Sequence, residues 1–247
     1  MRSALLTAAT LLTALVWTVA LVVDSEPFSP ASALLLGVGL LATGTVATIG
    51  MIVVGGRWAH RLGLASLAMT VVLAIVREID FLWVGGTVVT VIALVGLLSP
   101  TVTSNICKLP SASGPPPAAI TPPILLLLTP ALLGFVGNEA TPWALLVVGL
   151  SAPSAAFFYS RVIPGGLLGI RLIWPVAALA LSPLLGWISG AVAAALAIAV
   201  GVTAWDSSVK ASYHPPREVG TTLRIPTELT PREVLDAAQI DEKGHRR

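Results

Sequence analysis

Eight apolar runs separated by short polar segments dominate the sequence. A helix rises about 1.5 Å per residue and needs roughly 20 residues to cross a hydrocarbon core of about 30 Å, so such runs predict transmembrane helices. The predicted helices cover residues 3–23, 32–54, 62–76, 81–98, 123–136, 143–159, 172–185 and 188–205. The predicted fold is an all-α integral membrane protein, a bundle of about eight transmembrane helices. The third, fifth and seventh runs are shorter than the usual limit of about 17 residues.

The first run extends from Ser3 to Val23 and follows Met1 and Arg2. It is longer than the apolar region of a signal peptide, which has about 7 to 15 residues, and no clear Ala-x-Ala cleavage site follows it. We therefore expect a retained first transmembrane helix.

Two polar interruptions stand out between the runs. Arg77-Glu78-Ile79-Asp80 is the most charged and predicts the outer end of a tight hairpin between the third and fourth helices. The segment from Ser99 to Thr121 is polar and rich in proline, and it predicts the longest loop of the membrane portion.

The charges predict an orientation, because Lys and Arg concentrate in cytoplasmic loops. If the N-terminus is cytoplasmic, six of the bases outside the tail lie inside, and the acids lie outside with Arg77 as their only base. The inner bases are Arg2, Arg57, Arg61, Lys108, Arg161 and Arg171, and the outer acids are Asp24, Glu26, Glu78, Asp80 and Glu139. Tryptophans favour the headgroup level and fall near predicted helix ends, except Trp17, which lies deeper. Both termini are thus predicted to be cytoplasmic.

Composition narrows the range of functions. Hydrophobic residues make up 55% of the chain and charged residues 11%, with a mean hydropathy of +0.91. The net charge of +2 and the lack of a basic cluster indicate no nucleic-acid partner. Cys107 is the only cysteine, and His60, His214 and His245 lie outside the runs, so we expect neither a zinc site nor a haem ligated by two histidines. No metal or cofactor is predicted.

Catalytic and ion-relay groups are scarce in the predicted helices. No Asp, Glu, Lys, Arg or His lies well inside a predicted run, although such residues usually mark proton relays and ion paths. A nucleophilic Ser or Thr would lack an activating base there. An enzyme is therefore the less favoured class.

Prolines interrupt helices five to seven but not the first four. Pro130, Pro153, Pro175 and Pro183 free backbone carbonyls and kink their helices. They predict a cavity that also uses Ser151, Ser154 and Ser182, since interrupted helices often line transporter sites. The alternative is that these kinks pack against protein.

Small residues predict faces for close helix contact. Gly186, Gly190 and Ala194 share a spacing of four, and Gly37, Gly44 and Thr48 form a face on the second helix. These faces dock either another subunit or neighbouring helices of the same chain.

The outer acids Asp24, Glu26, Glu78, Asp80 and Glu139 come from three predicted loops. If the loops cluster, their carboxylates form a rim able to hold a divalent cation. Membrane glycosyltransferases that use lipid-linked sugars often carry acids in the first outer loop, which is an analogy of position only. The alternative is that these acids solvate loop ends.

A polar cytoplasmic tail is predicted from residue 206 to residue 247. Thr230-Pro231-Arg232-Glu233 combines an N-cap hydroxyl, a proline at the first helical position and a glutamate three residues after the cap, so it predicts a helix over 231–243. Val234, Leu235 and Ala238 form an apolar stripe suited to a cytoplasmic partner or to the protein's own loops, and a solvated helix without a partner is the alternative.

Three functional hypotheses follow. The first is a non-enzymatic membrane subunit of a bacterial envelope or transport assembly, bound to other subunits through the tail and the small-residue faces. The second is a small transporter or flippase for an apolar or zwitterionic solute, and the third is an outer-face enzyme acting on a lipid-linked substrate. Richness in Ala, Leu, Val, Gly and Pro is typical of GC-rich bacterial genomes. Together with the apolar runs, it predicts a multi-pass protein of the bacterial cytoplasmic (inner) membrane.

Overall fold

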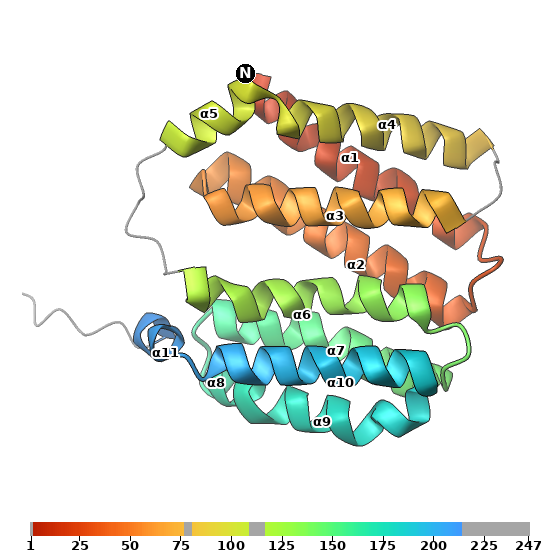
Figure 1. Cartoon of the computed structure of the whole chain (residues 1–247), viewed down its shortest axis with the longest axis vertical. Helices are drawn as coiled ribbons and strands as arrows, with labels where there is room; N and C mark the ends of the chain where they lie inside the picture. The colour runs from red at the N-terminus through yellow and green to blue at the C-terminus, as the bar shows by residue number, and fades with distance from the viewer. Residues whose placement is uncertain (1, 77–80, 109–116, 214–247) are drawn as a thin grey trace, which may run out of the picture. The chain divides into compact units, whose positions relative to one another are not determined.

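The computed structural model describes residues 2–76, 81–108 and 117–213, which belong to the first compact unit of the chain, Met1–Tyr213. Every regular element in these residues is helical (Figure 1). The α-helices are α1 (Arg2–Val23), α2 (Pro30–Ile49), α3 (Arg57–Val76), α4 (Phe81–Leu98), α5 (Pro100–Lys108), α6 (Pro117–Val136), α7 (Pro142–Ser160), α8 (Gly166–Leu168), α9 (Trp174–Leu181), α10 (Trp187–Ala204) and α11 (Ser207–Tyr213). The π-helical turns are η1 (Gly50–Val54) and η2 (Gly169–Ile173), and η3 (Ser182–Leu185) is a 3-10 turn.

Seven described segments are long and apolar enough to cross a membrane, and the shorter apolar helix Trp83–Leu98 accompanies them. The seven are Leu5–Val23, Pro30–Val53, Arg57–Ile75, Ala118–Val136, Pro142–Ser160, Gly166–Leu185 and Trp187–Ala204. By length and composition the chain is a helical, multi-pass membrane protein.

Three helical segments begin earlier than their apolar runs predict. Their observed starts are Arg57, Pro117 and Gly166, against predicted starts at 62, 123 and 172. An apolar run marks the part of a helix that lies in hydrocarbon, whereas the helix itself can continue into the headgroup region. The corresponding apolar helices have 19, 19 and 20 residues, so the predicted shortness of these helices was wrong.

Polar segments contain more helix than predicted. The predicted loop at 99–121 includes α5 and the start of α6, and α11 lies at the start of the predicted polar tail. The predicted helix at 231–243, with Val234, Leu235 and Ala238, lies outside the described residues, as do Glu78 and Asp80.

Helix α6 contains two adjacent prolines, Pro122 and Pro123, at the point where its apolar run was predicted to begin. Pro123 lies inside the helix and has no N–H to donate to the carbonyl of Ala119, four residues earlier. The hydroxyl of Tyr159 in α7 donates to that carbonyl at 3.2 Å. A side chain from a neighbouring helix thus replaces the bond that proline removes, which a backbone in lipid requires.

Helices α2 and α6 lie side by side (Figure 1), and each also packs against several others. Two glycines bring their backbones together. A Cβ atom at Gly39 would lie 2.4 Å from the backbone N of Ala131, and one at Gly134 would lie 2.6 Å from the backbone N of Leu36. Only glycine fits at both positions, and such close approach is how helices associate in lipid.

Two main clusters of buried side chains flank this contact. One lies among α1 to α4 and the other among α2, α6, α7, α9 and α10, so α2 contributes to both. Representative members are Trp17, Leu40, Leu73 and Trp83 in the first, and Leu133, Leu145, Val148, Trp174 and Val200 in the second. The α2–α6 contact therefore joins two separately packed halves.

Candidate functional site

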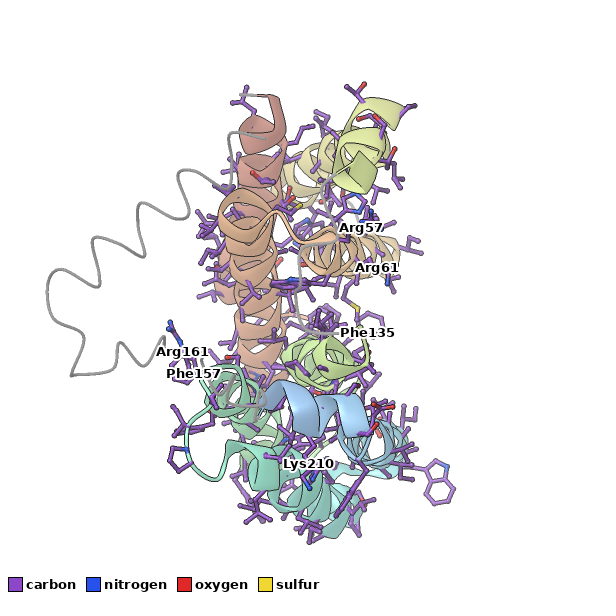
Figure 2. The ribbon with its side chains drawn as sticks, turned by 90° about the vertical axis from the view of Figure 1, so that its left-hand side faces the viewer. Arg57, Arg61, Phe135, Phe157, Arg161 and Lys210 are labelled. Carbon is purple, nitrogen blue, oxygen red and sulfur yellow. The ribbon has the colours of Figure 1, made fainter. Side chains whose placement is uncertain are left out.

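Successive long helices run in alternating directions, so the connections gather at two ends of the bundle (Figure 1). Exposed bases mark one end, and Figure 2 views the molecule from it. Arg57 and Arg61 begin α3, Arg161 follows α7, and Lys210 lies in α11. We call this end the basic end.

Arg171 also belongs near the basic end, but within a helical segment. It was predicted in the loop before the seventh helix, whereas it lies in η2, inside the apolar segment Gly166–Leu185. Its Nε donates to the carbonyl O of Ala204 at 2.8 Å, and its guanidinium lies 4.8 Å from the Trp205 ring centroid. A cation at the carbonyl end of α10 complements the helix dipole, so Arg171 fastens η2 to α10.

Asp206 starts the short helix α11 at the same end. The side chain and backbone N–H of Ser208 both donate to its carboxylate, the N–H at 2.8 Å. These hydrogen bonds hold the pKa of Asp206 below its ordinary value, because they favour the charged form.

The predicted acidic rim is described in part. Asp24 and Glu26 lie in the α1–α2 connection, and Glu139 lies in the α6–α7 connection, at the end opposite the basic end. Among the described residues no group of three or more His, Cys, Asp or Glu side chains is placed to hold a metal ion.

The kink prolines are distributed over several elements. Pro130 in α6 and Pro175 in α9 are buried, Pro153 in α7 is half-buried, and Pro183 in η3 is exposed. The nearby serines bond within their own segments, since Ser151, Ser154 and Ser182 donate to the carbonyls of Val148, Leu150 and Leu179.

The small-residue faces make contacts within the chain. On α2, a Cβ at Gly44 would lie 2.6 Å from the Cβ of Ala14, and Thr48 donates to the carbonyl of Thr7 at 3.1 Å. On α10, a Cβ at Gly190 would lie 2.4 Å from the carbonyl O of Ser182.

The other two members of the α10 face behave differently from Gly190. Gly186 is exposed, has a φ of +77° and forms the turn between η3 and α10, whereas Ala194 is half-buried. The close contact on this face is therefore made at Gly190.

A buried indole and hydroxyl network links α1, α3 and α4, and sequence patterns gave little indication of it. The Nε1 of Trp17 donates to the Oγ1 of Thr90 at 2.9 Å, and Thr90 donates in turn to the carbonyl of Gly86 at 2.7 Å. The Oγ1 of Thr70 lies 3.5 Å from that of Thr90, and the Trp83 ring meets Trp17 edge-on at 4.7 Å. The depth of Trp17 in its run was the one available signal.

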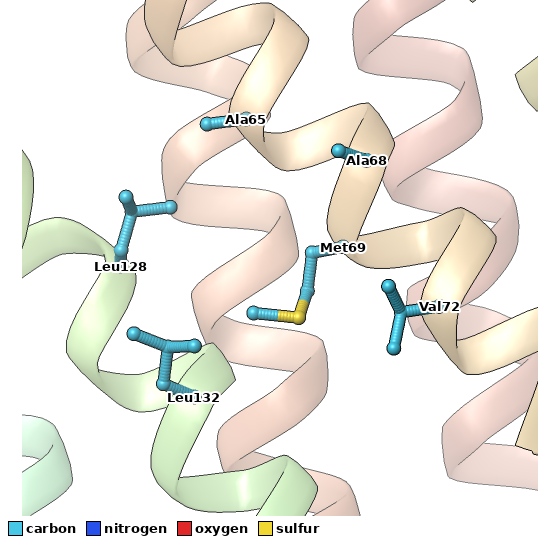
Figure 3. A pocket seen from close by; sticks show the side chains of 6 residues that line it. All are labelled: Ala65, Ala68, Met69, Val72, Leu128 and Leu132. Carbon is cyan, nitrogen blue, oxygen red and sulfur yellow. The ribbon is translucent and has the colours of Figure 1, made fainter. Parts of the chain in front are cut away.

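An apolar recess of about 340 Å³ lies between α3 and α6 (Figure 3). Its lining consists of Ala65, Ala68, Met69, Val72, Leu128 and Leu132. The candidate cavity predicted from the prolines was placed among α6 to η3 instead, so this recess is a feature that sequence reasoning missed. The adjacency of α3 and α6, which are distant in the chain, was needed to find it.

No family model, curated protein or solved structure matches the chain.

Proposed function

We propose that this protein is a non-enzymatic, multi-pass membrane subunit that serves as a scaffold in a bacterial envelope or transport assembly. The observation that supports this best is the backbone contact between α2 and α6 at Gly39 and Gly134. At this contact α2 and α6 leave no room for a methyl group, so no solute passes between them there. In this proposal, function resides on the outer faces of the bundle, which include the recess between α3 and α6, and at its two ends.

Buried hydroxyls support the same proposal, because they hold helices together. Thr43 donates to the carbonyl of Gly39 and lies 3.1 Å from the hydroxyl of Ser66 in α3, while Ser189 in α10 donates to the carbonyl of Val136 in α6 at 2.8 Å. A site for a polar solute would instead present such groups to a cavity. The recess between α3 and α6 is lined by apolar side chains alone.

The tail provides the first test of assembly. We expect the full chain, purified in mild detergent, to retain a protein partner in fixed stoichiometry, and Leu235→Asp to weaken retention at least about tenfold, equivalent to about 1.4 kcal/mol. The reason is that the aspartate would place a charge in the apolar stripe that includes Val234 and Ala238. Native mass spectrometry measures the stoichiometry.

Asp241→Asn is the matched control, since it changes a charge outside the stripe on the same predicted helix. A wild-type chain that runs as a lone monomer would contradict the scaffold proposal. Equal retention by Leu235→Asp and Asp241→Asn would remove the tail from the interface.

We also propose that the basic end faces the bacterial cytoplasm, with both termini on that side. Arg57, Arg61, Arg161 and Lys210 support this orientation, because bases near helix ends are retained in the cytoplasm. Asp24, Glu26 and Glu139 then face outward, and the lipid bilayer surrounds the apolar helices.

Cysteine labelling tests the orientation across α7. In a Cys107→Ser background, Asn138→Cys is expected to react with a membrane-impermeant maleimide in intact cells, because Asn138 is exposed before α7. Ser160→Cys, exposed at the other end of α7, is expected to react only after the membrane is permeabilised. Gel-shift labelling measures both, and the reverse pattern would overturn the orientation.

A further inference from the structure

The recess between α3 and α6 belongs to a longer stripe on one face of α3. Its residues Ala65, Ala68, Met69 and Val72 follow the three- and four-residue spacing of a single helix face. In Figure 3 the Met69 side chain points toward Leu132 of α6 across the recess. The recess is therefore an open apolar slot with one wall from each half of the bundle.

The same face continues to the basic end. Arg61 lies four residues before Ala65, and Arg57 lies four residues before Arg61, so both share the stripe. Both are exposed, and Figure 2 shows them at the near end of α3. The slot thus has cationic groups at its basic end and apolar walls further along.

The stripe is about as long as one acyl chain, which reaches through half of the hydrocarbon core. From Arg61 to Val72 the helix rises about 16 Å, and half of a hydrocarbon core of about 30 Å is about 15 Å. Further along, Phe135 of α6 is half-buried and packs against the buried cluster that contains Leu73. A partner helix crossing the membrane would need a groove about twice as long.

We propose that this slot binds one anionic phospholipid from the leaflet at the basic end. One acyl chain lies against Met69 and Leu132, and the phosphate lies at Arg61, whose guanidinium suits paired hydrogen bonds to phosphate oxygens. The acyl chain only moves from the apolar bilayer into an apolar recess, so the fit of its shape to the recess is what favours binding there. Arg61 contributes the preference for an anionic headgroup.

The test uses the purified full-length protein with phosphatidylglycerol and phosphatidylcholine of identical acyl chains. Native mass spectrometry is expected to show phosphatidylglycerol retained about fivefold better by the wild type, the effect of roughly one basic residue near the headgroup. Arg61→Gln is expected to remove the preference and leave phosphatidylcholine retention unchanged. Ala68→Phe, which fills the recess, is expected to lower retention of both lipids.

Two variants serve as matched controls. Arg161→Gln removes an exposed base at the same end but away from the slot, and Ala195→Phe enlarges an exposed alanine on α10. Both are expected to retain lipid as the wild type does. Size-exclusion profiles establish that each variant is folded, and Arg61→Gln changes an exposed side chain only.

Several results would overturn the proposal. Equal retention of the two lipids by the wild type removes the anionic preference, and an equal effect of Arg161→Gln assigns that preference to surface charge in general. An Arg61→Gln variant with wild-type preference excludes Arg61 as the headgroup contact. A dimer that Ala68→Phe dissociates identifies the occupant as a second copy of the chain.

Discussion

Gly39→Leu is expected to abolish recovery of folded protein, and Gly39→Ala to lower its stability severely. A Cβ at this position would lie 2.4 Å from the backbone N of Ala131 and 2.8 Å from its Cα. Backbone atoms cannot rotate away as a side chain can, so α2 and α6 must separate. Overpacking a well-packed core typically costs about 1 to 3 kcal/mol, and we expect Gly39→Ala to lie at or above the upper end. Thermal stability of the detergent-solubilised protein, followed by size exclusion, measures the loss.

A graded glycine series supplies the controls for this prediction. Gly85→Ala is expected to leave stability unchanged or to raise it slightly, because a Cβ there has no neighbour within 4 Å and alanine favours a helix more than glycine does. Gly37→Ala is expected to be intermediate, since its Cβ would meet the side-chain methyl of Thr18 at 3.2 Å. If Gly39→Ala and Gly85→Ala have the same melting temperature, α2 and α6 are not in backbone contact. The scaffold proposal then loses its main support.

The apolar runs predicted the helices well because the length of hydrocarbon to be crossed is a local property of the sequence. They did not predict the helix ends, because Arg57 and Pro117 extend helices beyond the hydrocarbon-like part of each run. Pro123 illustrates the same point, since its place inside α6 depends on Tyr159. That hydroxyl comes from another helix, and no local pattern announces it.

Contacts between helices were predictable only as faces. Gly37 and Gly44 were predicted to lie on a face for close helix contact, and the structure places both against α1. Gly39, which makes the tightest approach to α6, lies on a different side of α2, where Thr43 and Ala47 follow it at a spacing of four. Knowing which glycine is critical requires knowing which helix is the neighbour, and α6 is distant in sequence.

For the candidate sites, too, the sequence predicts local features but not which helices are neighbours. Clusters of charge at the two ends follow from helix alternation, so Arg61 and Arg161 could be assigned to one end from the sequence. The recess requires Met69 and Leu132 to face each other across two elements that are remote in the chain. Its relation to Arg61 becomes visible once α3 is seen to begin at Arg57.

Trp17→Ala is expected to give the second large loss of stability, about 3 to 5 kcal/mol, which is typical of removing a large buried aromatic side chain. Trp17 is fully buried, contacts Trp83 edge-on and donates its indole N–H to Thr90. Trp187→Ala is the matched control, because that indole is 95% exposed and its removal leaves no cavity. Equal melting temperatures for the two alanine variants would show that Trp17 is not a core residue.

Two smaller substitutions separate the stabilisation that comes from packing of the Trp17 ring from that of its hydrogen bond to Thr90. Thr90→Val leaves the Trp17 N–H buried without its acceptor, a situation that costs about 1 to 3 kcal/mol in proteins generally. Trp17→Phe keeps an aromatic ring and strands no polar group, because Thr90 still donates to Gly86. In Trp17→Phe/Thr90→Val no unpaired donor remains, so the double variant is expected to be more stable than the two single losses would predict by addition. Strict additivity would mean that the bond contributes nothing and that Trp17 stabilises the bundle through packing alone.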